Sequence, residues 1–335
     1  MRIQHVTPIL VKRYLNPKTR KRTVFLRGKS GIGKSDVIKQ TSDLLAQHVK
    51  DWKGVIDLRL AQCDPTDLRG IPHVIEGRTG WAKPDFLPST GSGILFLDEI
   101  TSAPPAVQAA AYQLTLTPED FGIPDTWMVI AAGNRKSDRG VTFNLAAPLQ
   151  NRMCDITVDT TLDDFLNYAI TQDIAPEILS FLRDRPDLLH KFEGGNNIQA
   201  FPSPRSWFAV SDVLEIDVPL QDRIEMIKGD VGEEAAIIFE THLRLWETMP
   251  RLDDILKGKP VSMPDELNVK YCVAMGLATR IDSDNFDNAW KFLENMSGDI
   301  QTLVMKLAYK RDPSIASAPA FSKWAIANAG AFSNV

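Results

Sequence analysis

The spacing of apolar residues along the chain changes near residue 160. Before that point, apolar runs of strand length alternate with turn residues and amphipathic segments, whereas later apolar residues recur at helical spacing. The apolar runs predict strands at residues 23–26, 54–60, 93–100, 127–134 and 154–159. Helical patterns lie between them, at residues 7–15 and 36–45 and from Pro104-Pro105 onward. This alternation predicts an α/β fold over residues 1–160, an αβα sandwich with a mostly parallel sheet.

Helical patterns fill the rest of the chain. They lie at residues 162–171, 175–183, 204–216, 222–228, 233–247, 265–280, 283–296, 299–311 and 319–329. Two connections between the predicted strands are less regular. Residues 61–93 are rich in proline and loop residues, and we predict a short helix near Thr66–Arg69 and a hairpin around Glu76–Trp81. For residues 115–126 we predict a small hairpin.

A glycine-rich turn joins the first predicted strand to the helix that follows it. Residues 28–35 have the pattern G-x-x-x-x-G-K-S, a P-loop in its required place between a strand and a helix. Its glycines let backbone N–H groups turn toward phosphate oxygens, and the helix N-terminus adds partial positive charge. Lys34 is placed to reach the β- and γ-phosphates, and Ser35 to offer its hydroxyl to Mg²⁺. The predicted phosphate-binding residues are Gly28, Lys29, Ser30, Gly31, Ile32, Gly33, Lys34 and Ser35.

Polar residues end the third and fourth of the predicted strands. Asp98 and Glu99 follow an unbroken apolar run, which is typical of a buried parallel strand, and such sheets bind ligands at the carboxyl ends of their strands. We predict that Asp98 holds Mg²⁺ and that Glu99 polarises the attacking water. Asn134 ends the following run, where it can orient the same water. Alone, these would be ordinary surface or turn residues; the P-loop upstream favours the catalytic roles.

Two arginines complete the predicted site. Arg152 stands just before the last predicted strand, from where an arginine can project onto the γ-phosphate held by a neighbouring subunit. Arg135 and Arg139 are alternative candidates for this role, and a surface ion pair is the alternative role for Arg152. Arg205 follows Pro204 at the start of a predicted helix, where it either points back at the phosphates or caps local structure.

Composition limits the class of protein. The 335 residues exceed one compact domain, and the net charge of −5 does not favour a dedicated nucleic-acid binder. Cys63, Cys154 and Cys272 have neither metal-ligand spacing nor a disulfide framework, so we expect reduced, buried thiols in a cytoplasmic protein. Neither a membrane span nor a signal-peptide pattern is expected from the apolar runs. No residue identifies the base, so ATP and GTP stay alternatives.

Two stretches leave the function open. One is a basic run that is either a solvated or subunit-facing surface or a nucleic-acid contact, formed by Lys12, Arg13, Lys18, Arg20, Lys21 and Arg22. With the second role, the chain would be a motor stimulated by DNA or RNA. The other is the stretch Asp67–Trp81, which is either a substrate-contacting surface or a loop packed on the sheet edge. A further alternative is a nucleotide-gated scaffold that hydrolyses slowly.

The order of these motifs resembles that of the AAA+ ATPases. The eleven-residue segment that begins at Asp98, Asp-Glu-Ile-Thr-Ser-Ala-Pro-Pro-Ala-Val-Gln, is similar to the segment after Walker B in MoxR-type ATPases. Ser203-Pro-Arg resembles their sensor 2, and the hairpin predicted before Asn134 resembles their pre-sensor-1 insertion. Val231-Gly-Glu-Glu-Ala-Ala and Arg311-Asp-Pro resemble the tail of a subgroup paired with von Willebrand A-type partner proteins.

This resemblance covers most of the chain and is specific to about residue 210. It implies roles that can be assigned residue by residue: Lys34 and Ser35 as Walker A, Asp98 and Glu99 as Walker B, Asn134 as sensor 1, Arg152 as the arginine finger and Arg205 as sensor 2. Two departures stand out. The sequence has Thr101-Ser102 where the family usually has Asn-Arg, and Arg135 where it often has Pro. The second leaves the choice among Arg135, Arg139 and Arg152 open.

The resemblance also implies an assembly and an activity. We expect a homo-oligomer, a hexameric ring, that uses Mg²⁺ and ATP. Hydrolysis would drive rotation of a lid and so remodel or activate a von Willebrand A-type partner protein. The expected domains are an AAA+ nucleotide-binding core at 1–160, a helical lid at 161–250 and a helical C-terminal extension at 251–335.

Overall fold

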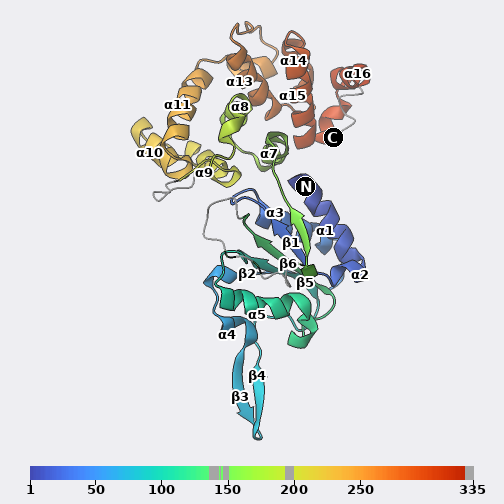
Figure 1. The fold of residues 1–335 in the computed structure, drawn as a ribbon. Helices are drawn as coiled ribbons and strands as arrows, with labels where there is room; N and C mark the ends of the chain where they lie inside the picture. Colours follow the sequence, from blue (N-terminus) through green and yellow to red (C-terminus); the bar gives the residue numbers. More distant parts are fainter. Residues whose placement is uncertain (136–142, 144, 146–150, 193–199, 329–335) are drawn as a thin grey trace. The chain divides into compact units, whose positions relative to one another are not determined.

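The chain forms two compact units, Met1–Thr160 and Thr161–Val335 (Figure 1). The computed structural model describes residues 1–135, 143, 145, 151–192 and 200–328. The first unit contains the strands, and the second is helical. A further division of the second unit at residue 250, into lid and extension, stays a prediction.

A parallel sheet is the centre of the first unit. Its strands are β1 (Val24–Arg27), β2 (Trp52–Arg59), β5 (Ser92–Asp98), β6 (Trp127–Gly133) and β7 (Cys154–Thr157). They lie in the order β2-β5-β6-β1-β7, and each neighbouring pair is parallel. The carboxyl ends of β1, β5 and β6 therefore meet at one edge of the sheet.

Helices cover both faces of this sheet. They are α1 (Val6–Leu15), α2 (Pro17–Arg20), α3 (Lys34–Ala46), α4 (Pro65–Arg69) and α5 (Pro105–Leu116). Leu10 of α1 and Ile38 of α3 share a buried cluster with Phe96 on one face. On the other face, Leu114 of α5 is buried with Leu95. Neighbouring residues of β5 thus enter different cores, which explains its unbroken apolar run. The predicted αβα sandwich is confirmed.

The connection before β6 is not the hairpin that we predicted. Residues 115–126 are all described, and they form a 3₁₀ helix, Pro118–Phe121, instead of paired strands. The backbone bonds locally: Asp120 donates to the carbonyl of Thr117, and Gly122 to that of Glu119. Pro118 has no N–H group for a strand ladder and fixes a φ suited to a helical turn. The resemblance to a pre-sensor-1 hairpin fails at this segment for the same reason.

A hairpin does form between β2 and β5. Strands β3 (Ile71–Ile75) and β4 (Arg78–Ala82) make a separate antiparallel sheet that projects from the first unit (Figure 1). The two-residue turn, Glu76-Gly77, has positive φ at both positions, the geometry that suits a tight hairpin. The hairpin is longer than the predicted one. Its strands do not pack on the edge of the main sheet, so that alternative is wrong for residues 71–82.

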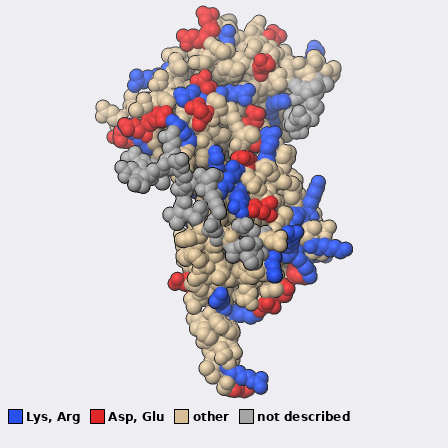
Figure 2. All heavy atoms as spheres, in the orientation of Figure 1, with Lys and Arg blue, Asp and Glu red and all other residues tan. Residues whose placement is uncertain are grey.

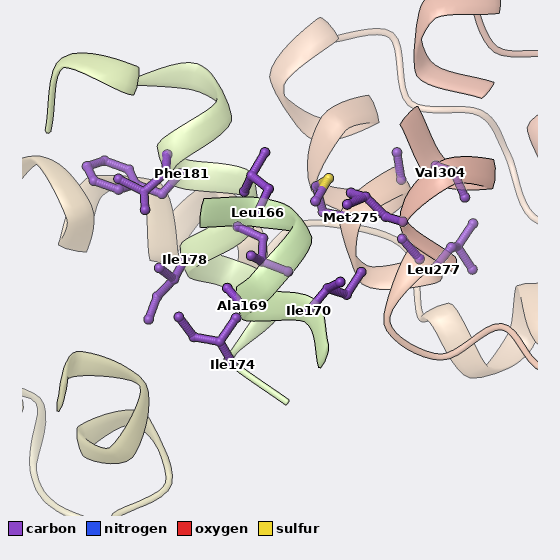
Figure 3. Close-up of a cluster of buried hydrophobic side chains, with 14 of the residues drawn as sticks. Leu166, Ala169, Ile170, Ile174, Ile178, Phe181, Met275, Leu277 and Val304 are labelled. Carbon is purple, nitrogen blue, oxygen red and sulfur yellow. The ribbon is translucent and has the colours of Figure 1, made fainter. Parts of the chain in front are cut away.

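The second unit is a set of helices around one hydrophobic core. The helices are α7 (Leu162–Ala169), α8 (Pro176–Asp184), α9 (Pro204–Leu214), α10 (Leu220–Val231), α11 (Glu233–Glu247), α12 (Leu252–Leu256), α13 (Leu267–Ala278), α14 (Phe286–Leu293), α15 (Gly298–Arg311) and α16 (Pro319–Ala327). Figure 3 shows Leu166 of α7 near Met275 of α13, with Val304 of α15 beyond it. Residues 272–278 of helix α13 are all buried, as expected for a central helix.

Cysteine burial differs from the expectation. All three cysteines are free, but only Cys272 is buried, whereas Cys63 and Cys154 are partly exposed. Cys154 lies on β7, an edge strand of the sheet, and Cys63 follows β2, the other edge strand. Edge strands are covered less completely, which accounts for the difference. Within the described part of the chain, no helix has both the length and the apolar composition to cross a membrane.

A buried histidine stands among the aromatic residues of the second unit. His242 of α11 is 7% exposed; its ring stacks on Phe239 and meets Phe181 edge-on. The Cys272 thiol lies 3.9 Å from its Nε2 atom. Burial lowers the pKa of His242, while the negative charge of Asp184 and a backbone hydrogen bond to Glu177 act in the opposite direction.

This histidine is expected to make the second unit less stable in mild acid. Below about pH 6.5, the ordinary histidine pKa, the unfolded chain binds a proton that the folded unit excludes, so the free energy of unfolding falls as pH is lowered. The slope from one such group is at most about 1.4 kcal/mol per pH unit. We expect His242→Leu to flatten the dependence of thermal stability on pH between about 7.5 and 5.5. Parallel pH profiles for variant and wild type would exclude His242 as the cause.

Candidate active site

The P-loop follows β1 and enters α3. Gly31 and Gly33 have φ of 73° and 94°, in the left-handed region where glycine is favoured. At Gly28 a Cβ would lie 2.6 Å from the Ile32 side chain and 3.0 Å from the Val158 carbonyl, so only glycine fits without movement. Helix α3 begins at Lys34, so the free N–H groups and the partial positive charge of its N-terminus lie at the loop.

Lys34 and Asn134 meet at the carboxyl edge of the sheet. The Lys34 ammonium donates to the carbonyls of Gly28, at 2.9 Å, and Lys29, at 2.8 Å. It also donates to Asn134 Oδ1 at 3.1 Å. Asn134 follows β6 directly, and β6 pairs with β1, so sheet pairing brings together two residues that are a hundred positions apart. Both side chains were predicted to serve the same phosphate site.

Ser35, the residue after Lys34, contacts Asp98 at the end of β5. The Ser35 hydroxyl donates to Asp98 Oδ2 at 3.1 Å. The second carboxylate oxygen of Asp98 accepts the backbone N–H of Glu99 at 2.8 Å. Hydroxyl and carboxylate oxygens are the ligands that Mg²⁺ prefers, and here they lie beside the N-terminus of α3. The residues present therefore fit a magnesium ion bound together with a nucleoside triphosphate.

Glu99 has an unusual backbone conformation. Its φ of 56° lies in the left-handed region, which a glutamate adopts only when the surrounding structure requires it. Two flanking hydrogen bonds fix this turn: Ile100 donates to the Ala132 carbonyl, and Ser102 donates to the Glu99 carbonyl. The Glu99 side chain is exposed beside the half-buried Asp98. At the end of β5, the Asp98 carboxylate therefore contacts Ser35, whereas the Glu99 carboxylate is exposed.

The candidate finger arginines differ in their surroundings. Arg135 is 20% exposed, forms an ion pair with Asp159 at 3.1 Å and donates to the Val158 carbonyl. Arg152 is exposed, just before β7, and Arg139 lies outside the described residues. The ion pair of Arg135 would have to break before that side chain could reach another subunit. Exposure therefore favours Arg152, although its role as a finger stays a prediction.

Arg205 belongs to the second unit. It occupies the first turn of α9, where the Ser203 side chain caps the helix by accepting from the Ser206 backbone N–H at 3.2 Å. The Arg205 side chain is exposed. Its local structure agrees with the predicted helix start at Pro204, and its role at the phosphates stays a prediction.

The arginines of the basic run form hydrogen bonds within the first unit. Arg13 donates to the carbonyls of Thr19 and Arg22, each at 3.3 Å, and Arg20 donates to that of Asp125 at 2.8 Å. Lys12, Lys18 and Lys21 are exposed at this surface. Figure 2 shows blue side chains gathered around α2. The run therefore serves partly to hold α1 and α2, which weakens its interpretation as a nucleic-acid contact.

Arg22, the last residue of this run, lies beside the segment of Arg152. Its Nη2 atom donates to the carbonyls of Asn151, at 3.5 Å, and Met153, at 3.2 Å. These are the residues immediately before and after Arg152. This contact was not predictable, because nothing in a basic run indicates which carbonyls its arginines bond.

Sequence patterns also missed two residues next to the acids. Asp57 lies on β2, which pairs with β5, and burial raises the pKa of its carboxyl, with the negative charges of Asp98 and Glu99 acting in the same direction. Thr101 is 3% exposed, and its hydroxyl accepts the backbone N–H of Asn134 at 2.9 Å. The only sequence signal for Thr101 was its departure from the MoxR-type pattern.

Comparison with known proteins defines the class of the first unit. Residues 23–153 match the family described as AAA domain (dynein-related subfamily). The match begins one residue before β1 and ends one residue before β7, so it includes the P-loop, Asp98, Glu99 and Asn134. Together with the parallel sheet and the P-loop geometry, it defines an AAA+ P-loop fold. The first unit is therefore an ATPase domain with a nucleotide-binding site at the P-loop.

Other comparisons are more distant. None of the curated proteins matches this chain. Among solved structures it resembles the RuvB Holliday junction branch migration motor of Thermotoga maritima, at 16% identity and a TM-score of 0.39, over 87% of this chain and 86% of that one. It also resembles a candidate ATPase of Cytophaga hutchinsonii, at 14% identity and a TM-score of 0.33, over 72% of this chain and 88% of that one. Similarity at this level assigns neither an activity nor a partner.

Proposed function

We propose that this protein is a Mg²⁺-dependent ATPase that acts as an oligomeric ring, a hexamer, and remodels or activates a partner protein in the manner of MoxR-type ATPases. The observation that carries the proposal is the meeting of Lys34 with Asn134 and of Ser35 with Asp98 at one edge of the sheet. This arrangement provides a cation, an amide, a hydroxyl and a carboxylate around the P-loop. A von Willebrand A-type protein is the proposed partner, on the resemblance of the helical tail.

Each side chain has a proposed part in hydrolysis. Backbone N–H groups of residues 28–35 and the Lys34 ammonium bind phosphate oxygens, while Ser35 and Asp98 hold the metal ion. Glu99 polarises the attacking water, and Asn134 orients it. Bound Mg²⁺ would neutralise charge on the phosphates and align them for in-line attack. Arg152 of a neighbouring subunit and Arg205 of the helical unit would stabilise the charge that develops on the γ-phosphate.

The test of the assembly is the ATPase rate per subunit measured against protein concentration, with and without single- and double-stranded DNA. A steep rise of the specific rate with concentration and no response to DNA support an oligomeric ATPase that acts on proteins. A rate that does not depend on concentration would contradict the need for an oligomer. A DNA response that disappears as salt rises would favour the motor alternative and a contact through the basic run.

The projecting hairpin is the proposed contact for the partner protein. Ile71, Val74, Ile75 and Trp81 are 65%, 78%, 54% and 53% exposed, an unusual density of large apolar side chains on one small element. Figure 2 shows no charged side chains along the strands of the hairpin, whereas charged side chains lie at its tip. Large exposed apolar side chains of this kind mark protein–protein contacts, because their burial is what stabilises a complex.

Ile71→Ser is therefore expected to weaken the apparent affinity for the partner roughly tenfold or more, without destabilising the fold. The partner is first captured with Glu99→Gln, a variant expected to bind ATP without hydrolysing it. Stimulation of the ATPase by this partner is then measured as the partner concentration is raised. Leu15→Ser, at an exposed leucine on the same unit, is the matched control, since Leu15 is 52% exposed. Unchanged stimulation in Ile71→Ser would remove the hairpin as a contact.

A further inference from the structure

Asn134 is held from two sides, and the two contacts come from different motifs. Its side-chain oxygen accepts the Lys34 ammonium at 3.1 Å. Its backbone N–H donates to the Thr101 hydroxyl at 2.9 Å. Thr101 comes two residues after Glu99, in the turn that follows β5. A continuous chain of hydrogen bonds therefore links the segment after the two acids to Asn134 and on to the P-loop lysine.

The Thr101 side chain is itself fixed by packing. It is 3% exposed, and a Cβ on Gly133 would lie 2.6 Å from its methyl carbon and 2.8 Å from its hydroxyl oxygen. Gly133 thus leaves just enough room for the threonine beside the end of β6. The backbone around Thr101 is held as well, since its carbonyl accepts the N–H of Phe143 at 2.6 Å. Two heavy atoms on Cβ restrict rotation about χ1 in such a space, and the hydrogen bond from the Asn134 N–H favours the observed position of the hydroxyl.

We propose that Thr101 is a positioning residue for Asn134: its hydroxyl fixes the backbone at residue 134 and so sets the direction in which the Asn134 amide meets the attacking water. A shift of about 1 Å in such a group can cost on the order of a hundredfold in rate. The hydroxyl is the required feature, because a hydrocarbon of the same shape would leave the partly buried N–H of Asn134 without an acceptor. This inference rests on the proposed role of Asn134.

The test begins with Thr101→Val, which keeps the shape and removes the acceptor. We expect kcat to fall by about tenfold to a hundredfold, with ATP affinity changed by less than about twofold. Thr101→Ser restores the acceptor and should recover most of the rate. Thr115→Val is the matched control: Thr115 is also 3% exposed, but its hydroxyl donates to the Tyr112 carbonyl within α5, away from the site. That variant should turn over at close to the wild-type rate. If Thr101→Val does not fold, Thr101→Ala replaces it.

The decisive measurement combines Thr101→Val with Asn134→Ala. If Thr101 acts through Asn134, adding Thr101→Val to the Asn134→Ala variant causes no further loss of kcat, because no side-chain amide remains to be positioned. A purely structural threonine would lower kcat in both backgrounds by the same factor, and that result would overturn the inference. Wild-type turnover of Thr101→Val beside a slow Asn134→Ala would do so too. Wild-type turnover of Asn134→Ala alone would instead contradict the proposed role of Asn134 in hydrolysis.

Discussion

Glu99→Gln is expected to bind ATP with unchanged affinity and to hydrolyse it about 10²–10⁴ times more slowly than the wild-type protein. Glutamine has the shape of glutamate and keeps the backbone N–H that bonds Asp98 at 2.8 Å. It lacks the negative charge that draws a proton from the attacking water. The measurements are phosphate release at saturating ATP and direct titration of ATP binding by calorimetry.

A second glutamate in the same unit provides the control. Glu119 is exposed in the 3₁₀ helix that precedes β6, at the opposite end of that strand from Asn134. Glu119→Gln removes the same charge and should leave turnover unchanged. Rapid hydrolysis by Glu99→Gln would transfer the role of base to another carboxylate. Asp57 is the next candidate, since burial and the negative charges of Asp98 and Glu99 raise the pKa of its carboxyl.

The local parts of the site were predictable because their signals are local. The glycines of the P-loop, the strand before it and the helix after it are neighbours in sequence, so one stretch specifies the whole motif. Asp98 and Asn134 were recognisable because each ends a run of apolar residues that both faces of the sheet bury. Parallel pairing then brings strand ends together, as the contact between Lys34 and Asn134 shows.

Features that depend on contacts distant in sequence were not predictable. The bond from Asn134 to Thr101 joins residues 33 positions apart, and only the pairing of β5 with β6 brings them together. Likewise, the ion pair between Arg135 and Asp159 forms only because β6 and β7 both pair with β1. This ion pair distinguishes Arg135 from the exposed Arg152. A sequence pattern contains neither the strand order nor the partners that follow from it.

The two predicted hairpins show a further limit of local patterns. Turn residues predicted a hairpin at both 76–81 and 115–126, yet strands form only around the first. The Glu76-Gly77 turn can adopt positive φ at both positions, whereas Pro118 begins a helical turn. Even where the hairpin was expected, its projection was not, because apolar residues on both faces of a strand usually indicate burial.

Arg152→Ala is expected to abolish turnover, by about 10³–10⁵-fold, while ATP still binds. An exposed arginine before β7 that reaches a neighbouring subunit would act on charge that appears only in the transition state, so removing it changes the rate and not the affinity. Arg135→Ala is the comparison variant. Because the Arg135 guanidinium is engaged with Asp159 and the Val158 carbonyl, its loss should affect stability more than the chemical step.

Mixing two inactive variants decides whether this arginine acts between subunits. Arg152→Ala retains Glu99, and Glu99→Gln retains Arg152, so a mixed ring contains sites at which an intact Glu99 faces an intact Arg152 from the neighbour. With random assembly of equal amounts, about a quarter of the sites are complete in a head-to-tail ring. We therefore expect activity in the mixture where each variant alone has none. An inactive mixture, with subunit exchange confirmed by labelled protein, would mean that Arg152 serves its own subunit, and the requirement for an oligomer would then need another origin.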